Sequence, residues 1–366
     1  MKVKIGDICT LKSGTSLKED ILNESNGVPY IKVSDMNLVG NEKYIVRANS
    51  YADESISEKM LFPEGTVLFP KRGGAIGTNK KRIASKAVCA DLNTMGVIPS
   101  DKIRPLYLYY YFQNIDFGTL YNGSSVPQIN NTDIAPMEIN LIPLEEQDDI
   151  VALLEKTDDI VRKRKEELSA IDDLIKARFV ELFGDAVDNP MGWEKKQLQE
   201  IVTDDCTISY GIVQTGDEQE EGVPVFRPVD IVNRVPKLEE LKKTTKEISN
   251  KYKRTILKGR EMLITVRANI ADTCIIGEEF KGCNVGRGIV PIRTQEDIIL
   301  LEFLKYLMDS KHLNDDIKGK AKGITLMQLN MEDLREVELI IPPIEQQRAF
   351  VEFAKQVDKS KVVDKN

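Results

Sequence analysis

The sequence of this chain repeats itself, and the repeat constrains its fold more than any other feature. Five blocks of the first half recur in the second half, in the same order and at offsets of 195 or 200 residues. The matching blocks are 27–32 with 222–227, 68–72 with 263–267, 106–112 with 301–307, 128–134 with 328–334, and 142–147 with 342–347. Because the order and spacing are kept, the chain is predicted to be a tandem duplication of one domain followed by one helix.

Each copy is predicted to mix strands and helices. Residues 28–33 and 223–229 have the composition of strands flanked by turn residues, and so do residues 66–70 and 261–266. Residues 104–113 and 298–308 are apolar on one side and are expected to form short helices. Near residue 130, Asn130 or Thr132 is expected to cap a one-turn helix with Asp133 in its first turn.

A much longer helix is expected between the two copies. No Pro or Gly interrupts residues 145–183, and Gly184 stands where a helix commonly ends. Apolar residues recur at three-and-four spacing from Ile150 to Leu182, so about 39 residues would form a rod of roughly 58 Å. Such a narrow apolar stripe favours a partner helix, as in a two-stranded coiled coil, over a core helix of one domain.

The length and composition set limits on the class of protein. A chain of 366 residues suits two domains of ordinary size, and it has no run of eighteen apolar residues that could span a bilayer. The N-terminus lacks the apolar stretch of a signal peptide, which predicts a cytoplasmic protein. The five cysteines are never spaced as CxxC, so free thiols are expected and a zinc site is not.

The net charge of −8 conceals two basic runs. Most of the excess of acidic over basic residues falls between residues 144 and 189. Between Lys71 and Lys86 there are six bases and no acid, and between Lys242 and Arg260 there are eight bases opposed only by Glu247. Local patches of this kind decide whether phosphates can be neutralised, although each run could also be a solvated face.

No catalytic constellation is found in the sequence. The single histidine, His312, lies in a charged segment and is interpreted as a surface residue. There is no GxSxG nucleophile motif, and Gly73–Gly77 matches neither the dinucleotide nor the phosphate-loop pattern. The glycines follow a predicted strand beside Lys71 and Arg72, which suits either a loop that approaches DNA or a plain turn. The chain is therefore interpreted as a binding protein.

Taken together, these features of the chain resemble a known family, the specificity subunits of type I restriction–modification enzymes. The resemblance rests on the two hinges, 142–147 (IPLEEQ) and 342–347 (PPIEQQ), each placed after a repeated domain and before a helix. The end of the long helix (179–185, FVELFGD) and the domain openings at 5–8 and 193–201 also fit. It implies an α+β fold with two tandem α/β target-recognition domains, joined by long helices that form an antiparallel coiled coil.

The resemblance also implies a function without catalysis by this chain. Each domain would recognise one half of a bipartite site in double-stranded DNA, and the helices would set the gap between the halves. Methyltransferase (M) subunits and restriction/translocase (R) subunits would assemble on the chain. S-adenosylmethionine, ATP and Mg²⁺ would be bound by those partners, and none of them by this chain. The open alternatives are a specificity subunit of a related two-gene system, a coiled-coil scaffold that binds no DNA, and an enzyme with an unrecognised site.

Four segments follow from these interpretations. They are recognition domain 1 (1–143), the long spacer helix (144–184), recognition domain 2 (185–341), and a short C-terminal helix with a polar tail (342–366). The second helix is expected to run from Glu345 to about Val357, much shorter than the first. Part of the long helix would then need cover from a methyltransferase subunit, another specificity chain or a separately encoded subunit.

Candidate DNA contacts are the basic and hydroxyl residues near the basic runs and the repeated turns. Arg72 and Arg267 occupy corresponding positions after the same predicted strand, which makes them the preferred base-reading candidates. The full set is Lys12, Ser13, Lys32, Ser34, Lys71, Arg72, Lys80, Lys81, Arg82, Ser124 and Ser125 in the first domain, and Arg227, Lys251, Lys253, Arg254, Arg267, Lys320 and Lys322 in the second.

Overall fold

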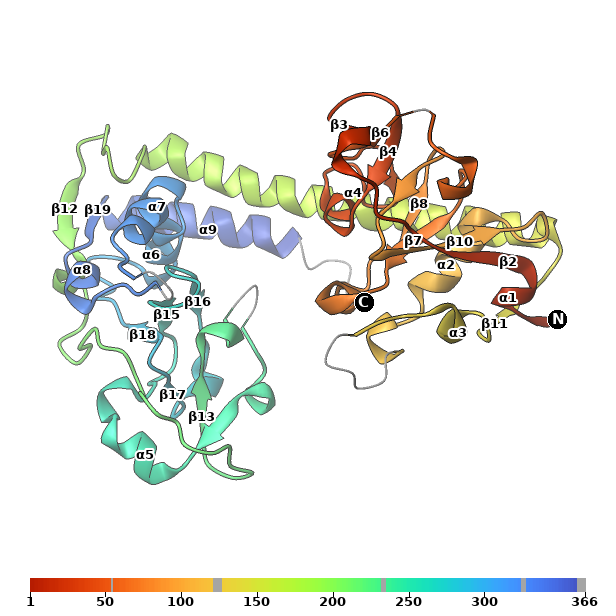
Figure 1. Cartoon of the computed structure of the whole chain (residues 1–366). Helices are drawn as coiled ribbons and strands as arrows, with labels where there is room; N and C mark the ends of the chain where they lie inside the picture. Colours follow the sequence, from red (N-terminus) through yellow and green to blue (C-terminus); the bar gives the residue numbers. More distant parts are fainter. Residues whose placement is uncertain (54, 121–126, 232–234, 324–326, 361–366) are drawn as a thin grey trace. The chain divides into compact units, whose positions relative to one another are not determined.

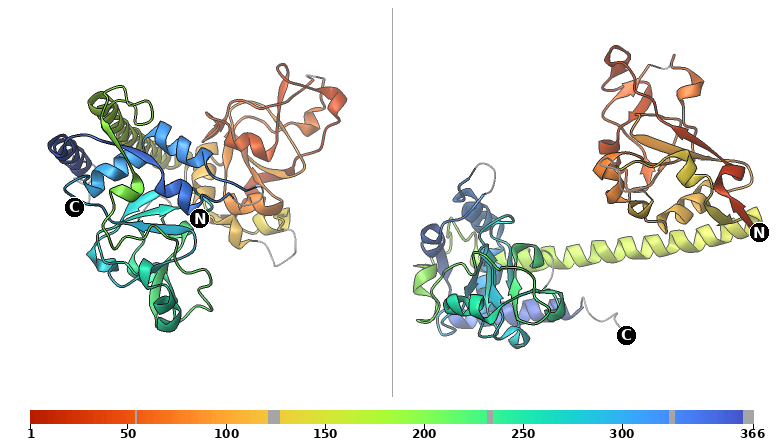
Figure 2. Two further views of the ribbon diagram at one scale, coloured as in Figure 1. Left: turned by 90° about the vertical axis from the view of Figure 1, so that its left-hand side faces the viewer. Right: turned by 60° about the horizontal axis from the view of Figure 1, so that its bottom comes forward.

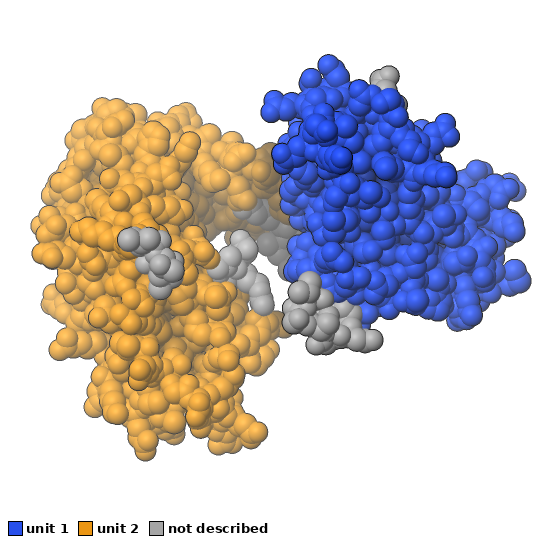
Figure 3. Space-filling model, in the orientation of Figure 1, with its two compact units in different colours: residues 1–164 blue, residues 165–366 orange. Residues whose placement is uncertain are grey.

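The structure is a computed structural model that describes all residues except 54, 121–126, 232–234, 324–326 and 361–366 (Figure 1). Two compact units divide the chain, Met1–Arg164 and Lys165–Asn366 (Figure 3). The division falls inside one long helix, α4 (Leu144–Phe183), because each half of this helix packs on its own unit. The four segments expected from the sequence stay a prediction.

The first unit consists of short strands and few helices, and it ends in the first half of α4. Its strands are β1 (Lys2–Lys4), β2 (Cys9–Ser13), β3 (Leu22–Asn23), β4 (Val28–Ile31), β5 (Tyr44–Ile45), β6 (Tyr51–Ala52), β7 (Val67–Pro70), β8 (Arg82–Ala84), β9 (Cys89–Ala90), β10 (Thr94–Pro99) and β11 (Glu138–Asn140). Its helices before α4 are α1 (Ile5–Ile8), α2 (Pro105–Gln113) and α3 (Asn131–Ile134). The expected strand at 66–70 and the expected helix at 104–113 are confirmed within one residue, whereas the strand expected at 28–33 is shorter than predicted and ends at Ile31.

The second unit has the same kinds of element. Its strands are β12 (Glu194–Gln197), β13 (Val223–Phe226), β14 (Lys242–Thr244), β15 (Met262–Thr265), β16 (Thr273–Ile275), β17 (Asn284–Val285), β18 (Ile289–Ile292) and β19 (Glu338–Ile341). Its helices after α4 are α5 (Lys246–Lys251), α6 (Leu301–Met308), α7 (Lys311–Gly319), α8 (Met331–Arg335) and α9 (Ile344–Ser360). The expected helix at 298–308 is shorter than predicted, and α9 extends beyond Val357.

The central strands of the two units follow the same order, as the repeat predicts. The order β10-β7-β8 in the first unit corresponds to β18-β15-β16 in the second. Likewise β6-β4-β9 corresponds to β14-β13-β17, and in both trios the pairing with the last strand is parallel. The strand pairs β1-β11 and β12-β19 join the start of each repeat to its end. Two views from other sides show the same elements (Figure 2).

Each unit has its own hydrophobic core. In the first unit, Val67 and Phe69 of β7 pack with Leu108 and Phe112 of α2, and Val151 of α4 closes this core. The rings of Phe69 and Phe117 lie 4.5 Å apart. A separate cluster around Ile31 and Phe62 includes Leu68 of β7, so it joins residues of the β3-β6-β4-β9 sheet to residues of the β2-β10-β7-β8-β5 sheet. Burial of such side chains stabilises a unit by about 1.5–3 kcal/mol each.

In the second unit, α9 packs alongside the second half of α4. Phe183 near the end of α4 contacts Phe350 near the start of α9, with 5.6 Å between ring centroids, so the two helices run antiparallel (Figure 1). Phe179 and Phe303 complete an aromatic cluster with these two rings. The antiparallel pairing of helices implied by the family resemblance is thus present in this unit.

The repeated hinge motif runs into the first turn of each of these helices and contains a buried glutamine that acts as a clamp. Gln147 is fully buried and donates from Nε2 to the carbonyls of Ile142 (2.8 Å) and Lys102 (3.1 Å), while its Oε1 accepts from the Arg104 N–H (2.8 Å). Gln347 makes the same three contacts in the second unit, with Pro342, Ile298 and Leu300. The repeated hinge motif therefore fixes how the helix leaves each domain.

The part of the chain that the structure describes contains no helix that is both long and apolar enough to cross a bilayer. Even α4, the longest helix, is too polar for this, with charged residues along most of its length.

Candidate nucleic-acid interface

An arginine–glutamine pair stands at the end of strand β7 in the first unit. Arg72 is exposed, and its Nε and Nη2 donate to Oε1 of Gln128 at 3.3 and 3.2 Å. The backbone holds the two residues together, because Ile129 N–H donates to the Lys71 carbonyl (2.9 Å) and Gly73 N–H donates to the Pro127 carbonyl (2.8 Å). Gln128 is itself oriented by Asn130, which accepts from Nε2 at 2.6 Å.

The second unit repeats this pair at the end of strand β15. Arg267 donates from Nε to Oε1 of Gln328 at 2.6 Å, and its Nη2 donates to the same oxygen. The backbone contact is also repeated, since Leu329 N–H donates to the Val266 carbonyl at 3.0 Å. Both pairs lie on isolated antiparallel bridges, Arg72 with Gln128 and Arg267 with Gln328.

In each pair, the glutamine occupies one edge of the guanidinium and leaves the other edge available for a ligand. The glutamine oxygen takes the Nε–Nη2 edge, so the Nη1 donors and the second Nη2 proton stay directed away from the pair. An arginine held in one orientation recognises the O6 and N7 atoms of guanine through such a fork, and it also suits a phosphate. The arrangement can therefore read a base edge or fix a backbone phosphate.

A loop follows each of the two arginines. In the first unit, the 3₁₀ helix Gly73–Thr78 begins at Gly73, whose φ of +72° favours glycine. A Cβ atom added at Gly73, Gly74 or Gly77 would meet nothing within 4 Å, so the surface of this loop is open. In the second unit Ala268 and Ala271 adopt φ of +60° and +64°, which L residues rarely do and which commonly marks functional loops.

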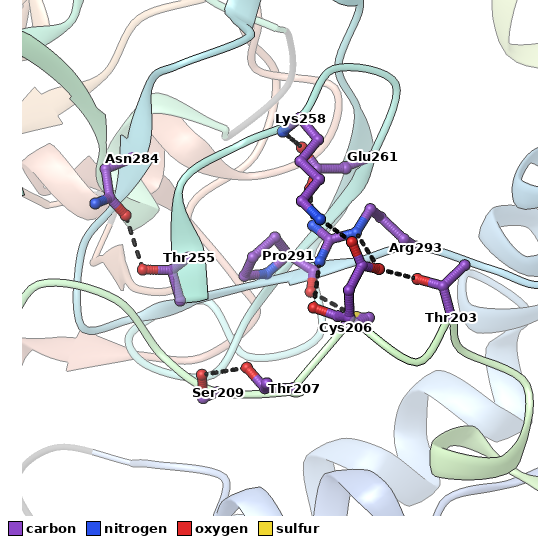
Figure 4. A network of polar contacts seen from close by, with 11 residues as sticks. Thr203, Cys206, Thr207, Ser209, Thr255, Lys258, Glu261, Asn284, Pro291 and Arg293 are labelled. Carbon is purple, nitrogen blue, oxygen red and sulfur yellow. Dashed lines mark hydrogen bonds and ion pairs between the residues drawn. The ribbon is translucent and has the colours of Figure 1, made fainter. Parts of the chain in front are cut away.

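An ion-pair network anchors the opposite end of strand β15 (Figure 4). Glu261, which is fully buried, pairs with Arg293, and Arg293 Nη2 also donates to the Asp205 carbonyl at 2.7 Å. Asp205 further pairs with Lys258 and accepts from Thr203 Oγ1 at 2.7 Å. The bases Arg293 and Lys258 thus form ion pairs within the second unit, beside the start of strand β15, whereas Arg267 follows the other end of this strand.

Several predicted DNA contacts in the first unit lie near Arg72, and others are engaged elsewhere. Lys71 donates to Ser13 Oγ at 2.7 Å, and burial lowers the pKa of this ammonium. Lys12 on β2 donates to the Leu61 carbonyl at 2.7 Å. Lys32 and Ser34 are exposed, Lys32 just before the 3₁₀ helix Val33–Asn37 and Ser34 within it, and Asn37 of this helix accepts from Lys80. Ser124 and Ser125 lie outside the described residues.

Two of the predicted contacts are turned inward, and the expectation of a surface position is wrong for Lys81. This side chain is 1% exposed and donates to Asn79 Oδ1 (2.6 Å) and the Ile115 carbonyl (2.7 Å), over the ring of Phe117. Arg82 is half-buried and donates to the carbonyls of Met36 and Lys81. Long-range contacts from residues 115–117 cover Lys81, and the local sequence gives no sign of them.

Burial also makes Lys81 a source of pH-dependent stability. Desolvation lowers the pKa of Lys81 from 10.5 to about 8, so the folded state loses this proton before the unfolded chain does. The free energy of unfolding is therefore expected to rise between pH 8 and pH 9.5, by up to about 1.4 kcal/mol per pH unit. Urea midpoints measured across this range check it, and Lys81→Met should reduce the slope. An equal slope in both proteins would contradict the prediction.

Among the predicted DNA contacts of the second unit, some form ion pairs within the unit and others are exposed. Arg227 forms a two-point ion pair with Asp230 (2.7 and 3.0 Å), which raises the pKa of the guanidinium, and Lys320 pairs with Asp316 at 2.9 Å. Lys322 is exposed, 3.7 Å from Asp333. The exposed residues Lys251, Lys253 and Arg254 line one shallow groove with Ser209 and Tyr210. This groove is the most concentrated basic surface among the candidates of that unit.

One group of side chains offers possible metal ligands within the described part of the chain. Asp185, Asp188 and His312 place ligand atoms within 4.8 Å of one another. The contact between His312 Nδ1 and Asp185 Oδ2 (2.5 Å) accounts for this proximity. His312 is largely exposed at the start of α7, as the sequence indicated.

Sequence reasoning missed the glutamine of each pair. Gln128 and Gln328 belong to the repeated blocks 128–134 and 328–334, yet neither was predicted to contact an arginine. The signal was present, because Arg72 and Gln128 recur together as Arg267 and Gln328, at offsets of 195 and 200. A charged residue and an amide duplicated together over such distances indicate a shared site.

Comparisons with known proteins agree with this architecture. A family model described as the type I restriction modification DNA specificity domain matches the chain twice, at residues 1–170 and 190–363. The chain is 23% identical to the type I restriction enzyme EcoBI specificity subunit of Escherichia coli, over 98% of this chain and 79% of that protein. It is 26% identical to the type I restriction enzyme MjaIX specificity subunit of Methanocaldococcus jannaschii, over 93% of this chain and 82% of that protein.

Solved structures show the same fold. A type I restriction-modification system S subunit from M. genitalium aligns with a TM-score of 0.51 at 14% identity, covering 99% of this chain and 90% of that one. A chain from a structural study of assembly and conformational transition in the type I R-M system aligns with a TM-score of 0.55 at 20% identity, with the same coverage. With a family model matching nearly its whole length, this chain belongs to the type I restriction modification DNA specificity domain family.

Proposed function

We propose that this chain is the specificity subunit of a type I restriction–modification complex and recognises a bipartite DNA site, one half with each unit. The observation that carries this proposal is the duplicated arginine–glutamine pair, present at the same strand end in both matched domains. Two similar readers on one chain suit a site with two separate halves. The chain itself performs no catalysis in this proposal.

The chemistry is assigned to partner subunits. Methyltransferase subunits would bind S-adenosylmethionine, and restriction/translocase subunits would bind ATP and Mg²⁺. The chain would act in the cytoplasm, where these partners meet the chromosome. Its own part is to hold two recognition units and to offer the helices α4 and α9 as a scaffold. This agrees with its similarity to relatives that are named specificity subunits of such enzymes.

A methylome tests the proposal. The chain is co-expressed with its methyltransferase subunit in an unmodified host, and methylated adenines are mapped by long-read sequencing. The expected result is a new two-part motif with a fixed gap that is absent when this chain is omitted. A stable complex that produces no new motif would overturn the proposal. A motif with only one half would restrict recognition to one unit.

Substitution of the two arginines should affect the two half-sites separately. Arg72→Ala is expected to relax one half of the motif, and Arg267→Ala the other, because each loses a fork worth about 1–3 kcal/mol of base discrimination. This corresponds to about 5- to 150-fold in preference, read as methylation at near-cognate sites. Lys86→Ala, which removes an exposed base from the same basic run, serves as the control and should change only overall affinity. Unchanged motifs in both arginine variants would exclude these residues as readers.

A further inference from the structure

Three exposed bases of the second unit lie together on one turn. Lys251 ends α5, and Lys253 and Arg254 begin the 3₁₀ helix Lys253–Thr255. Within the described residues these three bases form no ion pair, whereas Lys258 and Arg293 of the same unit do. They line a shallow groove, called here the basic groove, with the non-acidic residues Ser209, Tyr210, Asn250, Tyr252 and Thr255. The basic groove therefore keeps a local positive charge that suits an anionic ligand.

A buried polar network supports the basic turn (Figure 4). Asn284 of β17 is fully buried and donates from Nδ2 to Ser249 Oγ (3.0 Å) and to the Tyr252 carbonyl (3.4 Å). Its Oδ1 accepts from Thr255 Oγ1 at 2.7 Å, and Thr255 is buried as well. An amide that uses its donor and acceptor sides on one turn holds that turn in one arrangement. The bases between Tyr252 and Thr255 are thus presented by a fixed backbone.

The loop that supplies Ser209 and Tyr210 to the basic groove is also held in place. Ile208 has a φ of +39°, which is a rare backbone angle for a β-branched residue. Its carbonyl accepts from Arg335 Nη2 at 3.0 Å, and its side chain is buried in the core of the unit. Strain of this kind persists only where the surroundings enforce it, and it is common at binding sites. The fold therefore keeps two hydroxyl groups beside the basic turn.

The first unit has the same turn without these properties. At the offset of 195, the 3₁₀ helix Lys253–Thr255 corresponds to the 3₁₀ helix Glu58–Met60. Asn284 corresponds to Cys89, and both stand on strands that pair in parallel with matching partners. The sequence EKM in place of KRT has no net charge, and Met60 has no hydroxyl to donate. The bases and the network that supports them therefore belong to the second unit alone.

We propose that the basic groove binds backbone phosphates of DNA next to the half-site of the second unit, so that the two units hold DNA with unequal strength. This inference rests on the proposed function and adds a contact that carries no sequence information. Ammonium, guanidinium and hydroxyl groups suit phosphate oxygens. Asn284 and Thr255 would be positioning residues, and the phosphate-binding groups would be those of Lys251, Lys253, Arg254, Ser209 and Tyr210.

The basic groove lies near the arginine that is proposed to read the second half-site. Strand β17 begins at Asn284, and four residues later a Cβ added at Gly288 would lie 3.3 Å from Cβ of Arg267. Four residues of extended chain span at most roughly 14 Å, which is the length of about four base pairs. Arg287, an exposed base, lies on the loop between the two places. One short segment of DNA can therefore contact both Arg267 and the basic groove.

Salt-dependent DNA binding by the full chain tests the proposal. The probe is a short fluorescent duplex of arbitrary sequence, and its affinity is measured over a range of salt concentrations. Lys253→Ala and Arg254→Ala should each make the slope of log affinity against log salt less negative by about 0.9, which is about eightfold in affinity at about 0.1 M salt. Lys59→Ala, the matched control at the corresponding turn of the first unit, should leave the slope unchanged. Equal slopes in all four proteins, or an equal change in the control, would overturn the proposal.

The positioning residues are tested with the three bases in place. Thr255→Val keeps the shape of the side chain but removes the hydroxyl that donates to Asn284, so it should weaken binding about three- to tenfold and reduce the salt slope. Thr255→Ser keeps the hydroxyl and should restore both. A Thr255→Val chain with a lower urea midpoint but an unchanged slope would show a merely structural role and overturn the positioning role.

Mapping of methylated adenines separates this inference from the proposed function. Lys253→Ala should reduce methylation at the two-part motif without relaxing either half, whereas Arg267→Ala should relax one half. A two-part motif with equal salt slopes would overturn the basic groove and leave the proposed function standing. A chain that yields no motif, yet loses slope in Lys253→Ala but not in Lys59→Ala, would support a phosphate site and overturn the proposed function.

Discussion

Phe350→Ala is expected to destabilise the second unit by about 3–5 kcal/mol, the cost of a large cavity in an aromatic core. Phe350 is 1% exposed, and its ring lies 5.4 Å from Phe179, 5.6 Å from Phe183 and 5.2 Å from Tyr306. These rings join the second half of α4 to α6 and α9. The substitution would therefore loosen the helix pair as well as the core.

Urea unfolding followed by circular dichroism measures this change, with the fluorescence of Trp193 as a probe of the second unit. Trp193 donates from its ring nitrogen to the Phe183 carbonyl at 3.0 Å, so it reports on this cluster. Leu174→Ala is the matched control, because Leu174 lies on the same half of α4 with half of its surface exposed, and it should cost less than about 1 kcal/mol. Equal losses in the two variants would show that the aromatic cluster does not stabilise the helix pair.

The sequence was sufficient to predict the elements that repeat. Duplicated blocks placed the strands now seen as β4, β13, β7 and β15, because a pattern that occurs twice is separated from chance by its constant offset. The long helix was predicted within one residue of its observed bounds, since no Gly or Pro interrupts it. Helix α7 was not predicted as a separate element. Its buried side chains, Leu313 and Ile317, are only two among many charged neighbours.

The candidate site was predicted less completely, because the fate of a basic side chain depends on residues far away in sequence. Lys81 is covered by residues 115–117, and Arg227 is held by Asp230. Arg72 and Arg267 were singled out by position alone, while the glutamines that orient them stand 56 and 61 residues later. Local charge identifies bases that could reach DNA, but only the fold shows which of them are already bound within the protein.

Gln347→Met is expected to destabilise the second unit by about 3 kcal/mol or more. The methionine keeps the volume of the side chain but leaves three buried groups without their partner, the carbonyls of Pro342 and Ile298 and the N–H of Leu300. Each such group costs about 1–3 kcal/mol when it stays buried and unsatisfied. These contacts hold the start of α9 against the segment before α6. Without them, α9 should no longer be fixed in its orientation relative to the domain.

Gln346→Met is the matched control, since Gln346 is the exposed neighbour of Gln347 on the same turn, and its urea midpoint should stay within about 0.5 kcal/mol of the unmodified chain. Gln147→Met carries the same argument to the first unit, because Gln147 repeats all three contacts at the start of α4. If Gln347→Met and Gln346→Met unfold at the same urea concentration, the clamp contributes nothing to stability.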